Sequence, residues 1–217
     1  MYNCIIFDMD GTLIDSYEGI FRAYQWTMEK LGEPFKGDIL VKRAIGAPLP
    51  YVFEKICKMP IEKTKKAIEL YRGYYEKRGK KQAKAYEGIE RALQQLKKEG
   101  KFLGVATLKN KKFAVEILRD TGLSSYFNIV CGMDEEDRLT KAELIDQCRI
   151  AAGAEKEETI LVGDSEFDFS GAKEAGVSFL AVTYGFGYHT PEELKKENVS
   201  LVAAKALDIP RLLIGRL

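Results

Sequence analysis

Histidine is almost absent from this sequence, because His189 is the single one among 217 residues. Catalytic schemes that pair a histidine with a serine or cysteine nucleophile would therefore depend on that one residue. His189 follows a glycine-rich stretch, residues 185–188, where we expect a loop residue rather than a catalyst. The four cysteines are few and scattered, with no C-x-x-C pair. This spacing favours reduced, mostly buried thiols over a disulfide framework or a zinc site.

The sequence also lacks an excess of charge of one sign and a long hydrophobic run. The chain has 34 basic and 33 acidic residues, a formal net charge of +1, so no strong field would draw it to nucleic acid or to an anionic membrane. No apolar run reaches the ~20 residues needed to cross a bilayer, and no basic, apolar leader precedes the first expected strand. We therefore expect a cytoplasmic monomer or weak dimer that binds a small soluble ligand.

What the sequence does have is an acidic pair directly after a short apolar run. Residues 4–7 are predicted to form a buried strand, and Asp8 and Asp10 follow it just before Gly11. Side chains two residues apart on an extended chain point the same way, and the glycine then allows a sharp turn. Two carboxylates this close repel each other unless a cation lies between them or one of them is protonated. A simple turn cap is the alternative for so short a motif.

The segment after this motif is predicted to be an all-helical insert, residues 16–84. Asp15 and Ser16 offer N-cap oxygens for a helix from about Tyr17 to Leu31. Residues 37–84 contain apolar residues at helical spacing and no convincing strand. We thus expect a small helical bundle between the first strand and the rest of the chain.

Two parts of this insert allow more than one interpretation. The tyrosines at 71, 74 and 75 lie at helical spacing, which favours an apolar core face over stacking on a base. The basic segment 77–81 favours a solvated hinge over a cluster beside a phosphate pocket, because runs of charge are usually exposed.

From Tyr86 onward, predicted helices and strands alternate, which argues for a parallel sheet. After the first strand, the expected strands are 102–106, 129–131, 159–162, 179–182 and 201–202. The predicted fold class is α/β: a doubly wound, Rossmann-like parallel sheet with an inserted all-helical domain. The sheet domain would comprise residues 1–15 and 85–217, and the inserted domain residues 16–84.

Polar residues follow three of these strands, and their order along the chain carries a resemblance. The sequence resembles the haloacid dehalogenase-like (HAD) hydrolase superfamily, whose four signatures match, in order, Asp8-Met9-Asp10-Gly11-Thr12, Thr107, Lys141 and Gly163-Asp164-Ser165-Glu166-Phe167-Asp168. The insert resembles the type 1 helical cap of that superfamily, as in phosphoglycolate phosphatases, bacterial 5'-nucleotidase-like phosphatases and β-phosphoglucomutases.

The resemblance implies a catalytic role for each matching residue. Asp8 would be the nucleophile, a carboxylate that forms an acyl-phosphate later split by water. Asp10 would be the general acid and base. Thr107 would hydrogen-bond a phosphate oxygen, and Lys141 would neutralise part of the phosphate's charge. Three other lysines lie closer in sequence to Thr107 and are the alternatives to Lys141, namely Lys109, Lys111 and Lys112.

The resemblance also implies Mg²⁺, an ion that prefers hard oxygen ligands. Asp8 and Asp164 would supply carboxylates, and Asp10 would supply its backbone carbonyl oxygen. Asp168 would support the metal site, either directly or through a water or hydrogen bond.

Three further residues are expected on the substrate side. Gly11 and the backbone N–H of Leu108 would lie near the phosphate; leucine stands where the family often has asparagine or serine, so a side-chain contact is lost. Arg43 lies in the stretch 41–49, which resembles the cap loop of phosphoglycolate and nucleotidase-like phosphatases. Its guanidinium suits an acidic leaving group, and a surface ion pair is the alternative.

The function that the resemblance implies first is a Mg²⁺-dependent phosphatase of small phosphomonoesters, phosphoglycolate-like or nucleoside 5'-monophosphates. The alternatives are a phosphosugar mutase and an inactive member that binds a phosphorylated ligand or partner. Dehalogenation is disfavoured by Asp10, because members that act on carbon–halogen bonds commonly lack this acid. A nucleotide-binding oxidoreductase using Gly185-Phe186-Gly187 is disfavoured because no full G-x-G-x-x-G follows the first strand.

Overall fold

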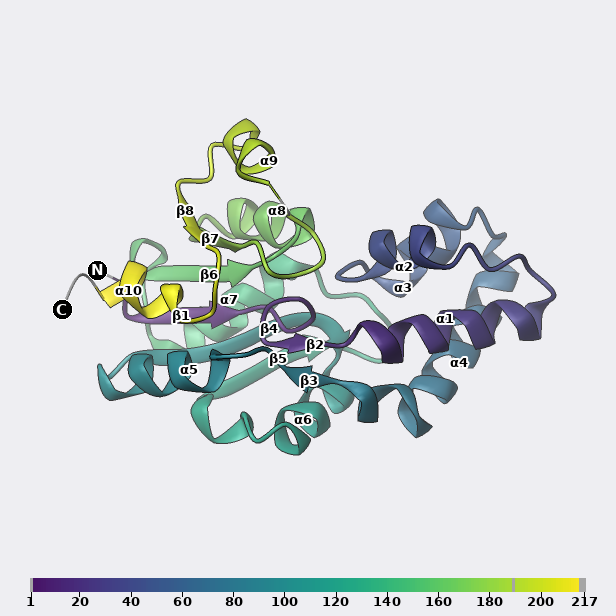
Figure 1. The fold of residues 1–217 in the computed structure, drawn as a ribbon, viewed down its shortest axis with the longest axis horizontal. Coiled ribbons are helices and arrows are strands. Elements are labelled where there is room, and N and C mark those ends of the chain that lie inside the picture. The colour runs from purple at the N-terminus through teal and green to yellow at the C-terminus, as the bar shows by residue number, and fades with distance from the viewer. Residues whose placement is uncertain (1, 189, 215–217) are drawn as a thin grey trace.

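A six-stranded parallel sheet forms the centre of the fold in the computed structural model, which describes residues 2–188 and 190–214 (Figure 1). The strands run in the order β5-β4-β1-β6-β7-β8, and each pairs in parallel with its neighbour. Their bounds are β1 Cys4–Phe7, β4 Phe102–Asn110, β5 Ile129–Met133, β6 Thr159–Gly163, β7 Ser178–Val182 and β8 Leu201–Ala203. The predicted α/β fold with a parallel sheet is confirmed.

Helices cover both faces of the sheet, which explains the unbroken apolar run in β1. Ile5 and Phe7 pack into the cluster on one face, and Cys4 and Ile6 into the cluster on the other. The first face is covered by α5 Ile89–Lys98, α6 Lys111–Asp120 and α10 Asp208–Ile214, and the second by α7 Lys141–Ala152 and α8 Glu166–Ala175. The short helix α9 Pro191–Lys196 packs beside β7.

The helical insert lies at one end of the sheet (Figure 1). It contains α1 Tyr17–Leu31, α2 Asp38–Ala44, α3 Leu49–Tyr51, a π-helical turn Val52–Ile56, α4 Ile61–Lys77 and a 3₁₀ turn Gly79–Gln82. Helix α1 packs along α4, and the rings of Tyr24 and Tyr71 lie 4.7 Å apart between centroids. The chain enters and leaves the insert through a two-stranded antiparallel ribbon, β2 Ile14–Asp15 and β3 Lys84–Ala85. The expected domain boundaries fall at this ribbon.

The structure differs from the expectations in two places that bear on the site. Strand β4 does not end at residue 106 but continues to Asn110, with a register irregularity after Thr107 in its pairing with β5. The basic segment 77–81 is only partly solvated, because Lys80 forms an ion pair with Glu116 on α6.

Two further expectations concern the chain as a whole. Among the residues described, none of the helices combines the length and apolar character needed to cross a membrane. His189, expected to be a loop residue, lies outside the described residues.

Candidate active site

Two carboxylates from strand ends and one from a helix meet at the edge of the sheet. Asp8 follows β1, Asp164 follows β6, and Asp168 lies in the first turn of α8. Oxygen atoms from all three lie within 4.8 Å of one another, and all three side chains are buried. Because β1 and β6 are adjacent parallel strands, their carboxyl ends place these side chains together.

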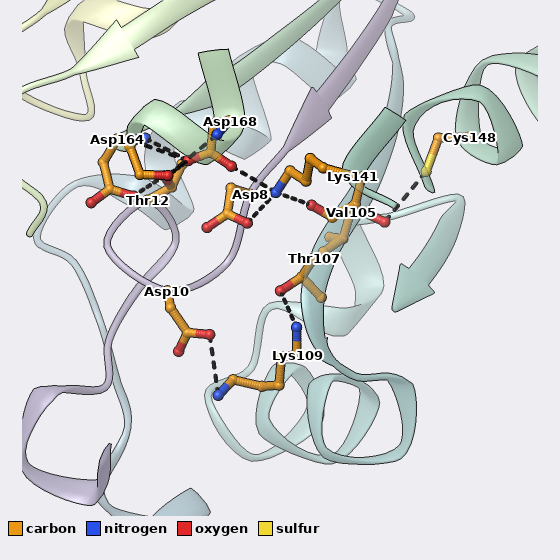
Figure 2. Close-up of polar contacts among 12 residues, drawn as sticks. Asp8, Asp10, Thr12, Val105, Thr107, Lys109, Lys141, Cys148, Asp164 and Asp168 are labelled. Atoms are coloured by element: carbon orange, nitrogen blue, oxygen red, sulfur yellow. Dashed lines mark hydrogen bonds and ion pairs between the residues drawn. The ribbon is translucent and has the colours of Figure 1, made fainter. Parts of the chain in front are cut away.

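Lys141 lies between two of these acids (Figure 2). Its Nζ pairs with Asp8 Oδ1, lies 2.7 Å from Asp168 Oδ1 and donates to the Ala106 carbonyl oxygen at 2.7 Å. A capping box formed by Thr140 and Glu143 fixes the start of α7, where Lys141 is the first residue. Burial disfavours the charged ammonium, but Asp168 and Asp8 outweigh burial and raise the pKa of Lys141. The lysine is therefore a permanent cation at the sheet edge.

The acids at this edge outnumber the cation. Burial and the carboxylates of Asp168 and Asp164 raise the pKa of Asp8 well above its usual range, although Lys141 offsets part of the effect. Burial and Asp168 raise the pKa of Asp164 to about 7. Three buried oxygen donors beside one ammonium leave an excess of negative charge, which a divalent cation would neutralise. The donor set thus fits Mg²⁺, and only hard oxygen ligands are present in it.

Asp164 is held by a glycine-rich loop that sequence reasoning did not assign to the site. Its Oδ2 accepts from the backbone N–H groups of Phe186 at 2.7 Å and Gly187 at 3.1 Å. A Cβ on Gly185 would lie 2.3 Å from the Gly11 carbonyl oxygen, so the loop approaches this closely only with glycine there. Gly11 itself has φ of 89°, and a Cβ there would collide with the Asp164 carboxylate. The sequence signal for this loop is the stretch Gly185-Phe186-Gly187, in which two glycines flank one residue.

Asp168 uses its carboxylate differently from Asp8 and Asp164. Its Oδ2 accepts from Ser165 N at 3.0 Å, Ser165 Oγ at 2.7 Å and Asp164 N at 3.2 Å, while Oδ1 faces Lys141. Both oxygens are thus engaged with protein donors, which favours the supporting role over direct metal contact.

Asp10 faces a second lysine (Figure 2). Its Oδ2 lies 3.1 Å from Lys109 Nζ, and its Oδ1 accepts from the Ser16 hydroxyl. Of the two residues expected to offer N-cap oxygens to α1, Asp15 accepts from Tyr17 N at 3.0 Å, whereas Ser16 makes no cap bond because its hydroxyl is bonded to Asp10. Lys109 also donates to the Tyr75 hydroxyl at 3.0 Å, which joins β4 to α4 of the insert. The alternatives Lys109 and Lys141 are therefore both at the site, Lys109 beside Asp10 and Lys141 beside Asp8.

A cavity of about 60 Å³ opens beside these residues, between the sheet edge and the insert. Of the predicted site residues, Asp8, Asp10, Thr107 and Leu108 line it. Arg43 is exposed on α2 and does not line it. Lys109, an alternative to Lys141, also lines it, and lining residues that the sequence did not point to include Arg72 and Tyr75 on α4 and Asp137 after β5.

The insert and most of the sheet match a known family. The family described as haloacid dehalogenase-like hydrolase matches residues 5–182. The chain belongs to the haloacid dehalogenase-like hydrolase family. Its relatives in this family include a 5'-nucleotidase of Pseudomonas aeruginosa, 33% identical over 187 residues that cover 86% of this chain and 85% of the relative. The pyrophosphatase PpaX of Halalkalibacterium halodurans is 31% identical over 183 residues, 84% of each chain.

A solved structure of the family agrees over the full length. A predicted phosphatase from Clostridium acetobutylicum superposes with a TM-score of 0.92 at 31% identity, covering 99% of each chain. The expectation of an enzyme, a hydrolase of phosphoric monoesters, is thus confirmed at the level of the haloacid dehalogenase-like family. The roles of individual residues stay predictions.

Proposed function

We propose that this protein is a Mg²⁺-dependent phosphatase that hydrolyses small phosphorylated compounds through an aspartyl-phosphate on Asp8. The observation that carries the proposal is the position of Asp8: a buried carboxylate paired with Lys141, beside Asp164, on the wall of a cavity. A protein that only bound phosphate would not need a carboxylate at this position, because a carboxylate repels phosphate.

The reaction would proceed in two displacements at phosphorus. An Asp8 oxygen attacks, the bond from phosphorus to the leaving oxygen breaks, and Asp10 donates a proton to that oxygen. Asp10 then takes a proton from water, whose oxygen attacks phosphorus, releasing phosphate and restoring the Asp8 carboxylate. Lys141, the Thr107 hydroxyl and the Leu108 N–H would hold the phosphate oxygens, with Gly11 close by.

Mg²⁺ would be held by the carboxylates of Asp8 and Asp164 and by the backbone carbonyl of Asp10, with Asp168 in support. When bound, the ion supplies positive charge that reduces repulsion between Asp8 and the phosphate. The engaged oxygens of Asp168 would fix Lys141 and the Ser165 turn around this site.

The helical insert would act as a cap, with residues 16–84 as one domain and residues 1–15 and 85–217 as the other. The ribbon β2–β3 is the covalent connection between them, and Lys109 with Tyr75 links them across the cavity. Closure of such a cap excludes water other than the attacking one.

Phosphate release from a panel of small phosphomonoesters tests the proposal. We expect turnover that requires Mg²⁺, stops with chelator and is lost in Asp8→Asn, while the exposed-site control Asp120→Asn behaves as the wild type. Normal turnover by folded Asp8→Asn would exclude the aspartyl-phosphate. Isomerised sugar phosphate without net phosphate release would indicate a mutase, and binding without turnover would indicate an inactive member.

A further inference from the structure

The cap contributes one guanidinium to the cavity wall, and the chemistry at Asp8 does not use it. Arg72 lies on α4 and lines the cavity together with Asp8, Asp10 and Lys109. Its side chain is 21% exposed, so most of this charged group is removed from water. A guanidinium in such a position needs anionic or carbonyl partners, since burial of an unpaired charge is unfavourable.

The partners of Arg72 in this structure fill only part of its hydrogen-bonding capacity. One terminal nitrogen donates to the Glu135 carbonyl oxygen at 2.9 Å, and the other lies 2.6 Å from Asp137 Oδ1. The buried Nε has no hydrogen-bond partner among residues 2–188 and 190–214. A buried donor without an acceptor is unfavourable and uncommon in folded proteins.

Asp137, the carboxylate paired with Arg72, lies in the loop after β5. Its φ is 55°, in the left-handed region, which aspartate tolerates better than most residues. Burial raises the pKa of Asp137 and neighbouring acids add to the effect, with Arg72 opposing it. Because Asp137 and Arg72 both lie on the cavity wall, an anion in the cavity could take the place of this carboxylate on the guanidinium.

The position of Arg72 is fixed relative to the reacting groups. Tyr75, one helical turn along α4, contacts Lys109 Nζ, which in turn contacts Asp10. Arg72 therefore lies on the same cavity wall as Asp8 and Asp10.

We propose that Arg72 binds an anionic group, carboxylate or phosphate, on the leaving group of the substrate, and that Asp137 takes this place on the guanidinium when the cavity is empty. The substrate class is then a small phosphorylated compound with a second negative charge a few atoms from phosphorus. This inference rests on the proposed phosphatase and narrows its substrates to those whose leaving group carries a negative charge, away from nucleoside monophosphates, whose leaving group is neutral.

Selectivity measured on matched substrates tests the proposal. The values of kcat/KM for 2-phosphoglycolate and for inorganic pyrophosphate are each divided by that for propyl phosphate, whose leaving group is neutral. In the wild type we expect one of the two ratios to exceed ten, and which one does so identifies carboxylate or phosphate as the anion. Arg72→Met should lower that ratio by about tenfold to a hundredfold, mainly through KM, because a hydrogen-bonded charge pair is lost.

Three variants separate recognition from a structural role. Arg43→Met removes the exposed cap arginine and should keep the wild-type ratio. Arg72→Lys keeps the charge without the two-pronged geometry and should give an intermediate ratio. Asp137→Asn removes the competing carboxylate and should lower KM for the preferred substrate severalfold. An unchanged ratio in folded Arg72→Met, a loss caused by Arg43→Met instead, or a wild-type preference for propyl phosphate would overturn the proposal.

Binding of non-hydrolysable analogues keeps this test independent of turnover. The analogue with the preferred anion, phosphonoacetate for carboxylate or methylenediphosphonate for phosphate, should bind at least about tenfold more tightly than propylphosphonate in titration calorimetry, and Arg72→Met should remove the difference. If no ester is turned over but this Arg72-dependent difference is present, the phosphatase proposal fails and the anion site stands. If esters are turned over and neither analogue with a second anion binds more tightly than propylphosphonate, the anion site fails and the phosphatase stands.

Discussion

The sheet edge and the cap build opposite sides of the same cavity by different means. On the sheet edge, Asp8 and Asp164 directly follow paired parallel strands, so the backbone register sets their separation. On the cap, Arg72 and Tyr75 project from one helix, and only the packing of α4 against the sheet domain places them at the cavity. In the proposed function, the edge would determine the reaction and the cap would determine which leaving group fits.

The two sides also differ in charge. The edge holds Asp8, Asp164 and Asp168 around Lys141, an arrangement with excess negative charge. Toward the cap, Lys109 and Arg72 are each paired with an acid, Asp10 and Asp137. Mutations at the edge should therefore abolish turnover, and those toward the cap should alter it in degree.

The largest effect is expected from Lys141→Met. The change leaves Asp8 and Asp168 without their shared cation, so kcat/KM should fall by about a thousandfold or more. Breaking a buried ion pair should also lower the free energy of unfolding by about 3–5 kcal/mol. Steady-state kinetics and urea unfolding measure the two effects, with exposed Lys111→Met as the control. Retention of more than a tenth of the activity would show that this lysine is not the phosphate's partner.

Asp164→Asn should remove activity and yet stabilise the metal-free protein above pH 7. The folded-state pKa of Asp164, raised by burial to about 7, exceeds its unfolded value, so the folded state binds this proton more strongly. Stability from this group is therefore present at low pH and is lost as pH rises from about 4 to about 7. The asparagine has no charge to bury, so at pH 8 it should gain at most about 4 kcal/mol.

Urea unfolding with chelator at pH 5 and pH 8 measures this difference. The stability gap between Asp164→Asn and the wild type should be small at pH 5 and large at pH 8, and Mg²⁺ should close it by stabilising the wild type alone. A variant that is less stable than the metal-free wild type at pH 8 would contradict the charge excess at the sheet edge.

Lys109→Met should have an intermediate effect, because Lys109 contacts Asp10 on one side and Tyr75 of the cap on the other. We expect kcat to fall by about tenfold to a hundredfold as Asp10 loses its cation. Stopped-assay kinetics on the preferred substrate give kcat and KM separately. If kcat fell as far as in Lys141→Met, residues toward the cap would be as essential to turnover as those at the sheet edge, contrary to expectation.

The smallest effect is expected at the surface link between cap and sheet domain. Lys112 pairs with Glu76 across this boundary, but both side chains are largely solvated. Lys112→Ala should leave the melting temperature and kcat/KM unchanged within error, because exposed ion pairs contribute little. A marked change in the melting temperature or in kcat/KM would mean that exposed ion pairs, rather than contacts inside the cavity, hold the cap in place.

The sheet edge could be predicted from the sequence because its signals are local. An apolar run indicates a buried strand, and polar residues directly after it lie at the carboxyl edge of a parallel sheet, as Asp8 and Asp164 do. Thr107 was expected to follow a strand in the same way but lies within β4. The strand pattern could not identify Lys141, because it is the first residue of a helix rather than a residue that follows a strand. Only the family signature identified it.

The cap side could not be predicted in the same way, because its residues resemble ordinary core and surface positions. Tyr71 and Tyr75 are buried as expected for a core face, and they also line the cavity, a fact that depends on what α4 packs against. Arg72 is next to Tyr71 in the sequence, and from the sequence alone it looks like an ordinary arginine on the surface of a helix. Arg43 was a candidate, with a surface ion pair as the alternative, because its loop resembles a family motif; the fold leaves it exposed on α2.

Chemical trapping of the intermediate tests the central claim most directly. Asp10→Asn, which lacks the base for the second step, is mixed with substrate and Mg²⁺, quenched and treated with borohydride, which reduces an acyl-phosphate to an alcohol. Peptide mass spectrometry should find homoserine at residue 8 and unmodified aspartate at residues 164 and 168. Reduction at another residue, or none at residue 8 while phosphate is being released, would contradict the account.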